Sequence, residues 1–324
     1  MFGPAWRRPC LIGAFIASSL VAGPLATTPL EAAPPASTPL KQEPASGGGT
    51  EAVAVLMERA KQGDPEAQYR LAALGLMGKL GKQDPKDILN LLSSASGRGN
   101  REAMFLLGTL HLKGWHLPKD PAKAAVLYKQ AAEAGHIQSQ TAYANLLHAG
   151  DGVVQDRPLA AQWFRKAADK GSGVAQTNLG LMYLRGEGVS RDSTQGLSLL
   201  NRAAESGLAG AQYNLATAYA NGEGVAQDGA KAMQWFVKAA ESGDQRAQYD
   251  LGVRLALGKG PARNPPEGMK WLLIAAVGPD ARLRQTAGEA VKKLTPVTGN
   301  QAVIDGGELS KLWLMKRQWQ TRTQ

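Results

Sequence analysis

The stretch GEGVAQDGAKAMQWFVKAAESG, residues 222–243, contains the features that decide the fold. Two glycines open it and a third closes it, and between them lie Asp228, the pair Trp235-Phe236 and two adjacent alanines. Glycine readily adopts the positive φ that ends a helix, and aspartate is a preferred helix N-cap. The stretch therefore predicts a helix with one apolar face, set between glycine stops, and such regular punctuation is typical of one unit of a repeat.

Copies of this stretch occur at a constant interval. GDGVVQDRPLAAQWFRKAADKG begins at residue 150 and GEGVSRDSTQGLSLLNRAAESG at residue 186, so each copy starts 36 residues before the next. At that interval six units align without a gap, beginning at Asp64, Asn100, His136, Ser172, Leu208 and Asp244. A glycine recurs at Gly78, Gly114, Gly150, Gly186, Gly222 and Gly258, and an acidic or amide residue at Asp84, Asp120, Asp156, Asp192, Asp228 and Asn264. A period kept over six units predicts a repeat protein.

Each unit predicts two antiparallel helices. The first begins at an N-cap such as Asp64, which Pro65 follows at the first helical position, and ends at the recurring glycine. Its apolar residues fall at helical spacing, for example Ala211, Leu215, Ala218 and Tyr219. The second helix is capped by the recurring acid and has the apolar stripe Ala232, Trp235, Phe236, Ala239 and Ala240. We therefore predict an all-α fold of stacked antiparallel helix pairs.

The repeat resembles a known family. The pattern A-x-x-x-L-G-x-x-Y-x-x-G-x-G-V-x-x-D-x-x-x-A-x-x-W-F-x-K-A-A-x-x-G is read most completely from residues 175–192 and 227–243, and it is similar to the Sel-one-like repeat (SLR), a relative of the tetratricopeptide repeat. The resemblance covers residues 64–279. It implies a right-handed α-solenoid, and a non-catalytic scaffold or adaptor that assembles envelope complexes or modulates signalling partners. The outer units depart from the pattern, as expected for the ends of a solenoid.

The N-terminus predicts export. Arg7 and Arg8 precede an apolar stretch from Cys10 to Leu25, the layout of a secretory signal peptide over residues 1–23, with a retained short anchor as the alternative. Cleavage would remove the single cysteine and with it any disulfide or thiol chemistry. We expect a periplasmic or secreted protein.

The segments that flank the repeats differ from them in composition. Residues 24–50, rich in Pro, Ala, Ser and Gly, predict a disordered linker, and residues 51–63 an N-terminal half-repeat. Residues 280–324 predict capping helices, in which Leu309, Leu312 and Trp313 would seal the last repeat. Gly306-Gly307 leaves the continuity of the final helix open.

The charge balance bears on the partners. The formal net charge of +10 falls to +8 without Arg7 and Arg8, and residues 280–324 hold eight Lys or Arg against four Asp or Glu. Because export separates a protein from most nucleic acid, we expect no nucleic acid partner, and instead an acidic protein or an anionic envelope polymer or lipid. The alternative is that the basic C-terminal end is only solvated and binds no partner.

Catalytic and metal-binding motifs are absent from the sequence, so we expect no catalytic residues, no bound metal and no cofactor. His111, His116 and His148 fall near one another in the repeat register, but polar core or surface positions explain them better than a metal or pH-sensing cluster. Trp163, Trp235 and Trp271 occupy the expected buried slot of the second helix, rather than a ligand-stacking position.

Subtracting the buried stripe from the first helices leaves repeat positions 3, 7, 10 and 14, which form a continuous strip. In the central units these positions hold Gln138, Asn145, Asn178, Arg185, Asn214, Thr217, Asn221, Arg246 and Asp250. Amide side chains both donate and accept hydrogen bonds, so this strip predicts a concave groove for an extended peptide. The alternative is that these residues are polar only because they face solvent, and that they bind nothing. We expect that replacing Asn178 and Asn214 by alanine weakens partner capture and leaves the melting temperature unchanged.

Together these observations predict an exported, non-catalytic interaction scaffold of the bacterial envelope. A cell-wall or glycan-binding module that uses the basic C-terminal end is one alternative, which peptidoglycan pull-down at varied salt would separate. A hydrolase with an unrecognised nucleophile is another, which esterase and lactam activity probes would test.

Overall fold

The computed structural model describes residues 49–81, 83–258 and 263–322, and these residues form helices and no strand. The helices are α1 (Gly49–Lys61), α2 (Pro65–Leu76), α3 (Pro85–Gly97), α4 (Arg101–Lys113), α5 (Pro121–Glu133), α6 (Ile137–Ala149), α7 (Arg157–Asp169), α8 (Gly173–Arg185), α9 (Ser193–Glu205), α10 (Ala209–Asn221), α11 (Gly229–Glu241), α12 (Gln245–Leu257), α13 (Pro265–Ala275), α14 (Ala281–Thr298) and α15 (Asn300–Arg322). The all-α prediction is confirmed for this part of the chain. The predicted signal peptide and nearly all of the predicted linker lie outside it.

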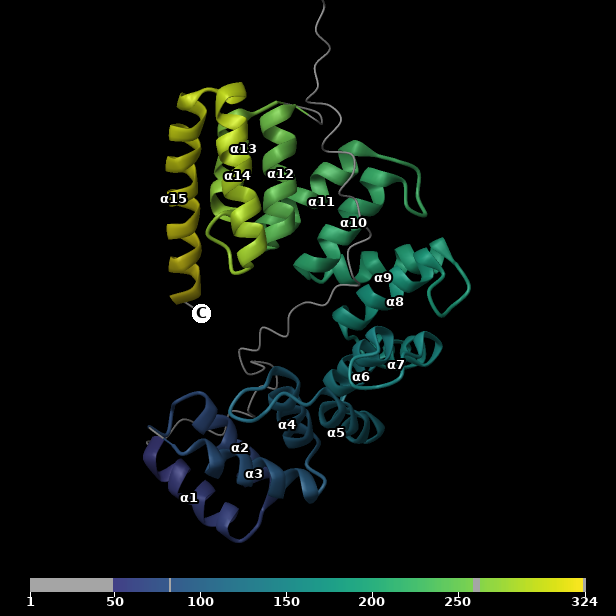
Figure 1. The fold of residues 1–324 in the computed structure, drawn as a ribbon, viewed down its shortest axis with the longest axis vertical. Coiled ribbons are helices and arrows are strands. Elements are labelled where there is room, and N and C mark those ends of the chain that lie inside the picture. Colours follow the sequence, from purple (N-terminus) through teal and green to yellow (C-terminus); the bar gives the residue numbers. More distant parts are fainter. Residues whose placement is uncertain (1–48, 82, 259–262, 323–324) are drawn as a thin grey trace, which may run out of the picture.

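The helices follow one another along an open arc, from α1 at one end to α15 at the other (Figure 1). We call α2, α4, α6, α8, α10 and α12 the first helices, and α3, α5, α7, α9, α11 and α13 the second helices. Each first helix packs against the second helix that follows it, and that second helix packs against the next first helix. This is the predicted stack of helix pairs, in which each repeat buries surface only against its neighbours.

The helix ends explain the recurring glycines and acids. Gly150 ends α6 with a φ of 75°, and its backbone N–H donates to the carbonyl of Leu146. In the connector that follows, Asp156 accepts a hydrogen bond of 2.9 Å from the backbone N–H of Leu159 and so caps α7. In the other central repeats, a glycine with positive φ likewise ends the first helix and an aspartate caps the second helix. These two residues fix where the helices start and stop.

Small residues set the spacing of the helices. Gly180 of α8 faces Gly196 of α9 so closely that a Cβ added to either would lie 2.8 Å from the carbonyl oxygen of the other. The alanine pairs Ala167-Ala168 and Ala239-Ala240 of the second helices are buried, as are Phe164 and Phe236 of the same helices. A larger side chain at these crossings would force the helices apart.

A recurring glutamine joins consecutive repeats. Gln176 near the start of α8 is buried, and its Nε2 donates to the carbonyl oxygen of Ala168 at the end of α7, at 3.2 Å. The same bond is made by Gln68, Gln140, Gln212 and Gln248. Helical spacing does not reveal this role, although the glutamine recurs at one register position in all but one of the six units, where Met104 replaces it. The carbonyl of Ala168 also accepts from the backbone N–H of Gly171 at 3.0 Å, so the glutamine adds a second hydrogen bond that ties the next first helix to the end of the second helix.

The C-terminal helices pack on the last pair. The helix α15 is continuous through Gly306-Gly307, and a Cβ at Gly306 would lie 2.7 Å from the Cβ of Met269 in α13. Trp313 packs edge-on against Trp271, with ring centroids 5.5 Å apart. Leu309 and Leu312 remain exposed, so Trp313 alone of the three expected residues seals the repeat.

Candidate functional site: the first-helix surface

Side-chain hydrogen bonds cross directly between neighbouring first helices. Asn178 Nδ2 on α8 donates to Asn145 Oδ1 on α6 at 2.9 Å, and the Tyr213 hydroxyl on α10 donates to Asp250 Oδ2 on α12 at 3.0 Å. Each first helix is therefore flanked by other first helices as well as by second helices. Its surface towards solvent is narrower than that of a helix packed on one side only.

The nine residues of the predicted strip differ in their exposure. Gln138 and Asn221 are exposed, whereas Asn178 is fully buried. The others are partly exposed, namely Asn145, Arg185, Asn214, Thr217, Arg246 and Asp250. We call these residues, without Asn178, the first-helix surface.

The burial of Asn178 changes one expectation of the sequence analysis. Its side chain bonds Asn145 inside the stack, so Asn178→Ala would remove a buried hydrogen bond. The melting temperature should then fall, and Asn178 cannot serve as a neutral test of binding. One repeat on, Leu181 occupies the register position of Asn145, and the buried Nδ2 of Asn214, the equivalent of Asn178, finds no acceptor among the described residues.

The contact between α10 and α12 is the most strongly charged part of this surface. The guanidinium of Arg246 lies 4.3 Å from the centre of the Tyr213 ring and pairs with Asp244 at 2.6 Å. Burial raises the pKa of Asp250, and burial together with the neighbouring Asp250 raises the pKa of Tyr213. These groups bond one another across the two helices, so their arrangement explains helix packing and gives no pair poised for acid–base chemistry.

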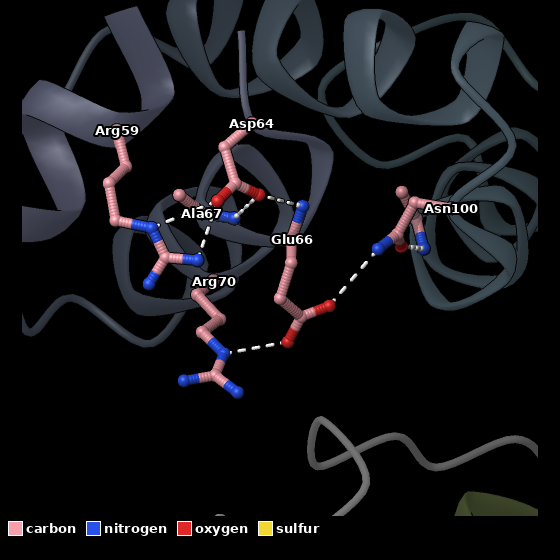
Figure 2. A network of polar contacts seen from close by, with 7 residues as sticks. Arg59, Asp64, Glu66, Ala67, Arg70 and Asn100 are labelled. Atoms are coloured by element: carbon pink, nitrogen blue, oxygen red, sulfur yellow. Dashed lines mark hydrogen bonds and ion pairs between the residues drawn. The ribbon is translucent and has the colours of Figure 1, made fainter. Parts of the chain in front are cut away.

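A similar polar contact lies at the N-terminal end of the array (Figure 2). Glu66 of α2 accepts from Arg70 Nε at 2.6 Å and from Asn100 Nδ2 at 3.1 Å, and Asn100 is the N-cap of α4. Asp64 accepts from Arg59 Nε at 2.9 Å and caps α2. Glu66 occupies repeat position 3, the register of Gln138 and Arg246, so the polar character of the strip extends beyond the central units.

The histidines do not gather into a metal site. Within residues 49–81, 83–258 and 263–322, no group of three or more His, Cys, Asp or Glu side chains could hold a metal ion. His148 Nε2 lies 3.0 Å from Glu187 Oε2 in the next connector. Burial lowers the pKa of His111, and burial lowers that of His136 to about 4. His136 has a structural task, because its Nδ1 caps α6.

The tryptophans of the second helices belong to the packing. Trp163 and Trp271 are buried and Trp235 is partly buried, as the repeat register predicted. Lysine side chains cover the rings, with Lys166 Nζ 4.0 Å from the centre of Trp163 and Lys270 Nζ 4.3 Å from that of Trp271. These indoles offer no free face for a ligand to stack on.

Helix pairs of constant length that stack along an arc, with a polar surface on the first helices, define a solenoid repeat protein. The sequence profile of the Sel1 repeat matches residues 65–95, 101–136, 137–172, 173–208, 209–244 and 245–276. The chain therefore belongs to the Sel1 repeat family, as the sequence analysis predicted. Sel1 repeat proteins generally act as non-catalytic scaffolds that mediate protein–protein interaction.

Several solved structures are similar to this chain. A Sel1 repeat protein from Oxalobacter formigenes is 30% identical, with a TM-score of 0.66 over 69% of this chain and 90% of that chain. A protective antigen of uropathogenic Escherichia coli with an SLR fold is 24% identical, with a TM-score of 0.43 over 79% of this chain and 64% of that one. An immunity protein from Pseudomonas aeruginosa is 26% identical, with a TM-score of 0.43 over 72% and 82%. Comparison with curated proteins finds no match.

In the described part of the chain, no helix combines the length and the apolar composition needed to cross a bilayer.

Proposed function

We propose that this protein is an exported scaffold of the bacterial envelope, and that its first-helix surface binds an extended segment of a partner protein. The observation that carries the proposal is the row of exposed and partly exposed polar side chains that runs from Gln138 on α6 to Asp250 on α12. The row crosses four repeats, and the apolar faces of the same helices are buried in the stack.

The chemistry of the row suits a peptide main chain. Gln138, Asn145 and Asn221 carry amides, which can donate to a carbonyl and accept from an N–H at the same time. These amides lie on α6 and α10, two repeats apart, and therefore favour a ligand that offers donors and acceptors at more than one point along its length. An extended polypeptide has this property, because every residue other than proline offers one N–H and one C=O.

Two exposed residues test this surface without disturbing the fold. In the double variant Gln138→Ala/Asn221→Ala, capture of the envelope partner should fall at least about tenfold with an unchanged melting temperature. The matched control is Gln162→Ala/Gln195→Ala, which removes exposed glutamines from the second helices α7 and α9. Captured proteins are quantified by mass spectrometry after pull-down with each purified variant. If both double variants retain the partner as well as the wild type, the first-helix surface is not the binding site.

Export rests on the N-terminal sequence. The basic pair Arg7-Arg8 and the apolar stretch that follows support a signal peptide. Fusion of residues 1–48 to alkaline phosphatase, which is active only outside the cytoplasm, should give an active enzyme in a bacterial host. The same fusion with Arg7→Glu/Arg8→Glu should be less active. Equal inactivity of both fusions would contradict export.

A further inference from the structure

The connector between α4 and α5, residues 114–120, has the same backbone as the other connectors. The N–H of Trp115 donates to the carbonyl of Leu110 at 3.2 Å, and the N–H of Asp120 donates to that of His111 at 2.8 Å. The next connector makes the same two bonds, from Asp151 to Leu146 at 3.2 Å and from Asp156 to Leu147 at 2.9 Å. The path of the chain is therefore set by the repeat and not by the side chains of this connector.

The side chains of this connector nevertheless depart from the repeat. Where the next three connectors have an acid followed by glycine, this one has Trp115 followed by His116. Among the described residues, His116 is the one non-glycine residue with positive φ, at 62°. Side chains with a Cβ disfavour this left-handed conformation, and the equivalent Gly188 has so little room that a Cβ would lie 2.5 Å from the backbone of Arg157.

Both side chains leave much of their surface to solvent. Trp115 is 46% exposed and His116 is also exposed, so a large part of the indole is free for contact with another molecule. A disfavoured backbone conformation together with an exposed indole is better explained by contact with another molecule than by stability. The exposure of Trp115 differs from that of Trp163 and Trp271, which are buried in the helix stack.

The side chains around Trp115 carry a net positive charge. Lys113 precedes it and the exposed Lys119 follows, Asp120 caps α5, and the acid found at the position of Trp115 in the next three repeats is missing. Those repeats present Asp151, Glu187 and Glu223 at the equivalent position. The connectors 150–156 and 222–228 each carry two acids and no Lys or Arg, so they would repel an acidic ligand that this connector attracts. In the connector 186–192, Arg185 and Arg191 occupy the positions of Lys113 and Lys119, but Glu187 and Asp192 offset them.

We infer that the connector 114–120 is a second docking site, separate from the first-helix surface, for an acidic peptide segment of a partner protein that covers Trp115 with an apolar side chain. Tryptophan is enriched among residues that dominate protein–protein affinity, because it combines a large apolar area with little conformational freedom. Lys113 and Lys119 would attract the acidic residues on either side of that apolar anchor.

A variant that restores the repeat pattern tests this site. Trp115→Glu/His116→Gly converts Gly-Trp-His to the Gly-Glu-Gly of residues 186–188. Because the backbone already has the repeat conformation, this variant should fold with a melting temperature equal to or above that of the wild type. Val154→Ser is the matched control, since Val154 is an apolar residue of the next connector that is 89% exposed.

The probes are three fluorescent twelve-residue peptides that share one Leu-Phe pair and are otherwise acidic, neutral or basic, measured by fluorescence anisotropy with the full chain. The acidic peptide should bind at least about tenfold more tightly than the basic one, and the Trp115→Glu/His116→Gly variant should lose at least about tenfold in affinity. Val154→Ser should bind like the wild type.

Three results would overturn the inference. The first is equal binding of the three peptides, and the second is undiminished binding of the acidic peptide by the repeat-restoring variant. The third is binding of polygalacturonate, a carboxylated polysaccharide, without binding of any peptide. None of these results depends on Gln138 or Asn221, so failure here is distinguishable from failure of the first-helix surface.

Discussion

His136 makes the stability of the array sensitive to pH. It is the N-cap of α6, where its Nδ1 accepts from the backbone N–H of Ser139 at 3.3 Å and lies 2.8 Å from the Ser139 hydroxyl. Its ring also packs on Phe105, with centroids 5.2 Å apart. A protonated imidazole cannot accept these bonds, and its positive charge would lie at the positive end of the helix dipole. The folded state therefore favours the neutral form of His136.

The expected loss of stability follows from the two pKa values. Burial lowers the pKa of His136 in the folded protein to about 4, from an ordinary value of 6.5. The unfolded chain thus takes up the proton first, so the contribution of His136 is complete above pH 6.5 and is lost as the pH falls towards 4. Between pH 7.5 and pH 5 the linkage amounts to about 2 kcal/mol, which corresponds to a fall of about 4 °C or more in the melting temperature.

The assay compares thermal unfolding of the wild type with that of His136→Asn from pH 7.5 to pH 5, followed by circular dichroism. Asparagine is a good N-cap, so the variant should match the wild type near pH 7.5 and exceed it by about 4 °C at pH 5. His136→Ala separates the two effects, because it should be about 1 kcal/mol less stable than His136→Asn at every pH and share its flatter pH dependence. A parallel fall of wild type and His136→Asn would refute this explanation of the buried histidine.

Other substitutions probe other features of the fold. Gln176→Met, which copies the residue at position 104, should lower the free energy of unfolding by about 1 kcal/mol in urea titration. An unchanged free energy would show that the glutamine hydrogen bond does not stabilise the stack. Gly180→Leu should cost about 3 kcal/mol or prevent folding, whereas Gly173→Ala in the same helix should be tolerated because its added Cβ meets only ordinary contacts beyond 3.4 Å. Asp250→Asn should raise the melting temperature at pH 7 but not at pH 3, because the raised pKa means that ionisation of the buried carboxyl destabilises the folded state; an equal effect at both pH values would contradict this.

The repeat architecture could be predicted because its signals are local and recur. Gly186 and Gly222 end their helices with positive φ, and Asp192 and Asp228 cap the next ones, as their positions in the sequence indicated. Each of these tasks depends on a few neighbouring residues and on backbone conformations that few residue types adopt. Repetition at a fixed interval then separates these signals from chance.

The exposure of the polar strip was harder to predict, since it depends on contacts between repeats. Subtracting one buried stripe treats each first helix as packed on one side, but Asn178 also faces Asn145 on the preceding first helix and is buried by it. Asn214 shares its register and remains partly exposed, with Leu181 where Asn145 would be. The difference arises from residues about one repeat away, which a helical pattern read within one unit does not contain.

The central claim, that the first helices form a docking surface for a protein partner, is tested most directly by site-specific photocrosslinking in the native cell. A photoreactive amino acid is placed in turn at Gln138 and Asn221 on the first helices, and at Gln162 and Gln195 on the second helices. The account predicts that the two first-helix positions crosslink to the same partner protein and that the second-helix positions do not. Crosslinks to that partner from the second helices alone would contradict it.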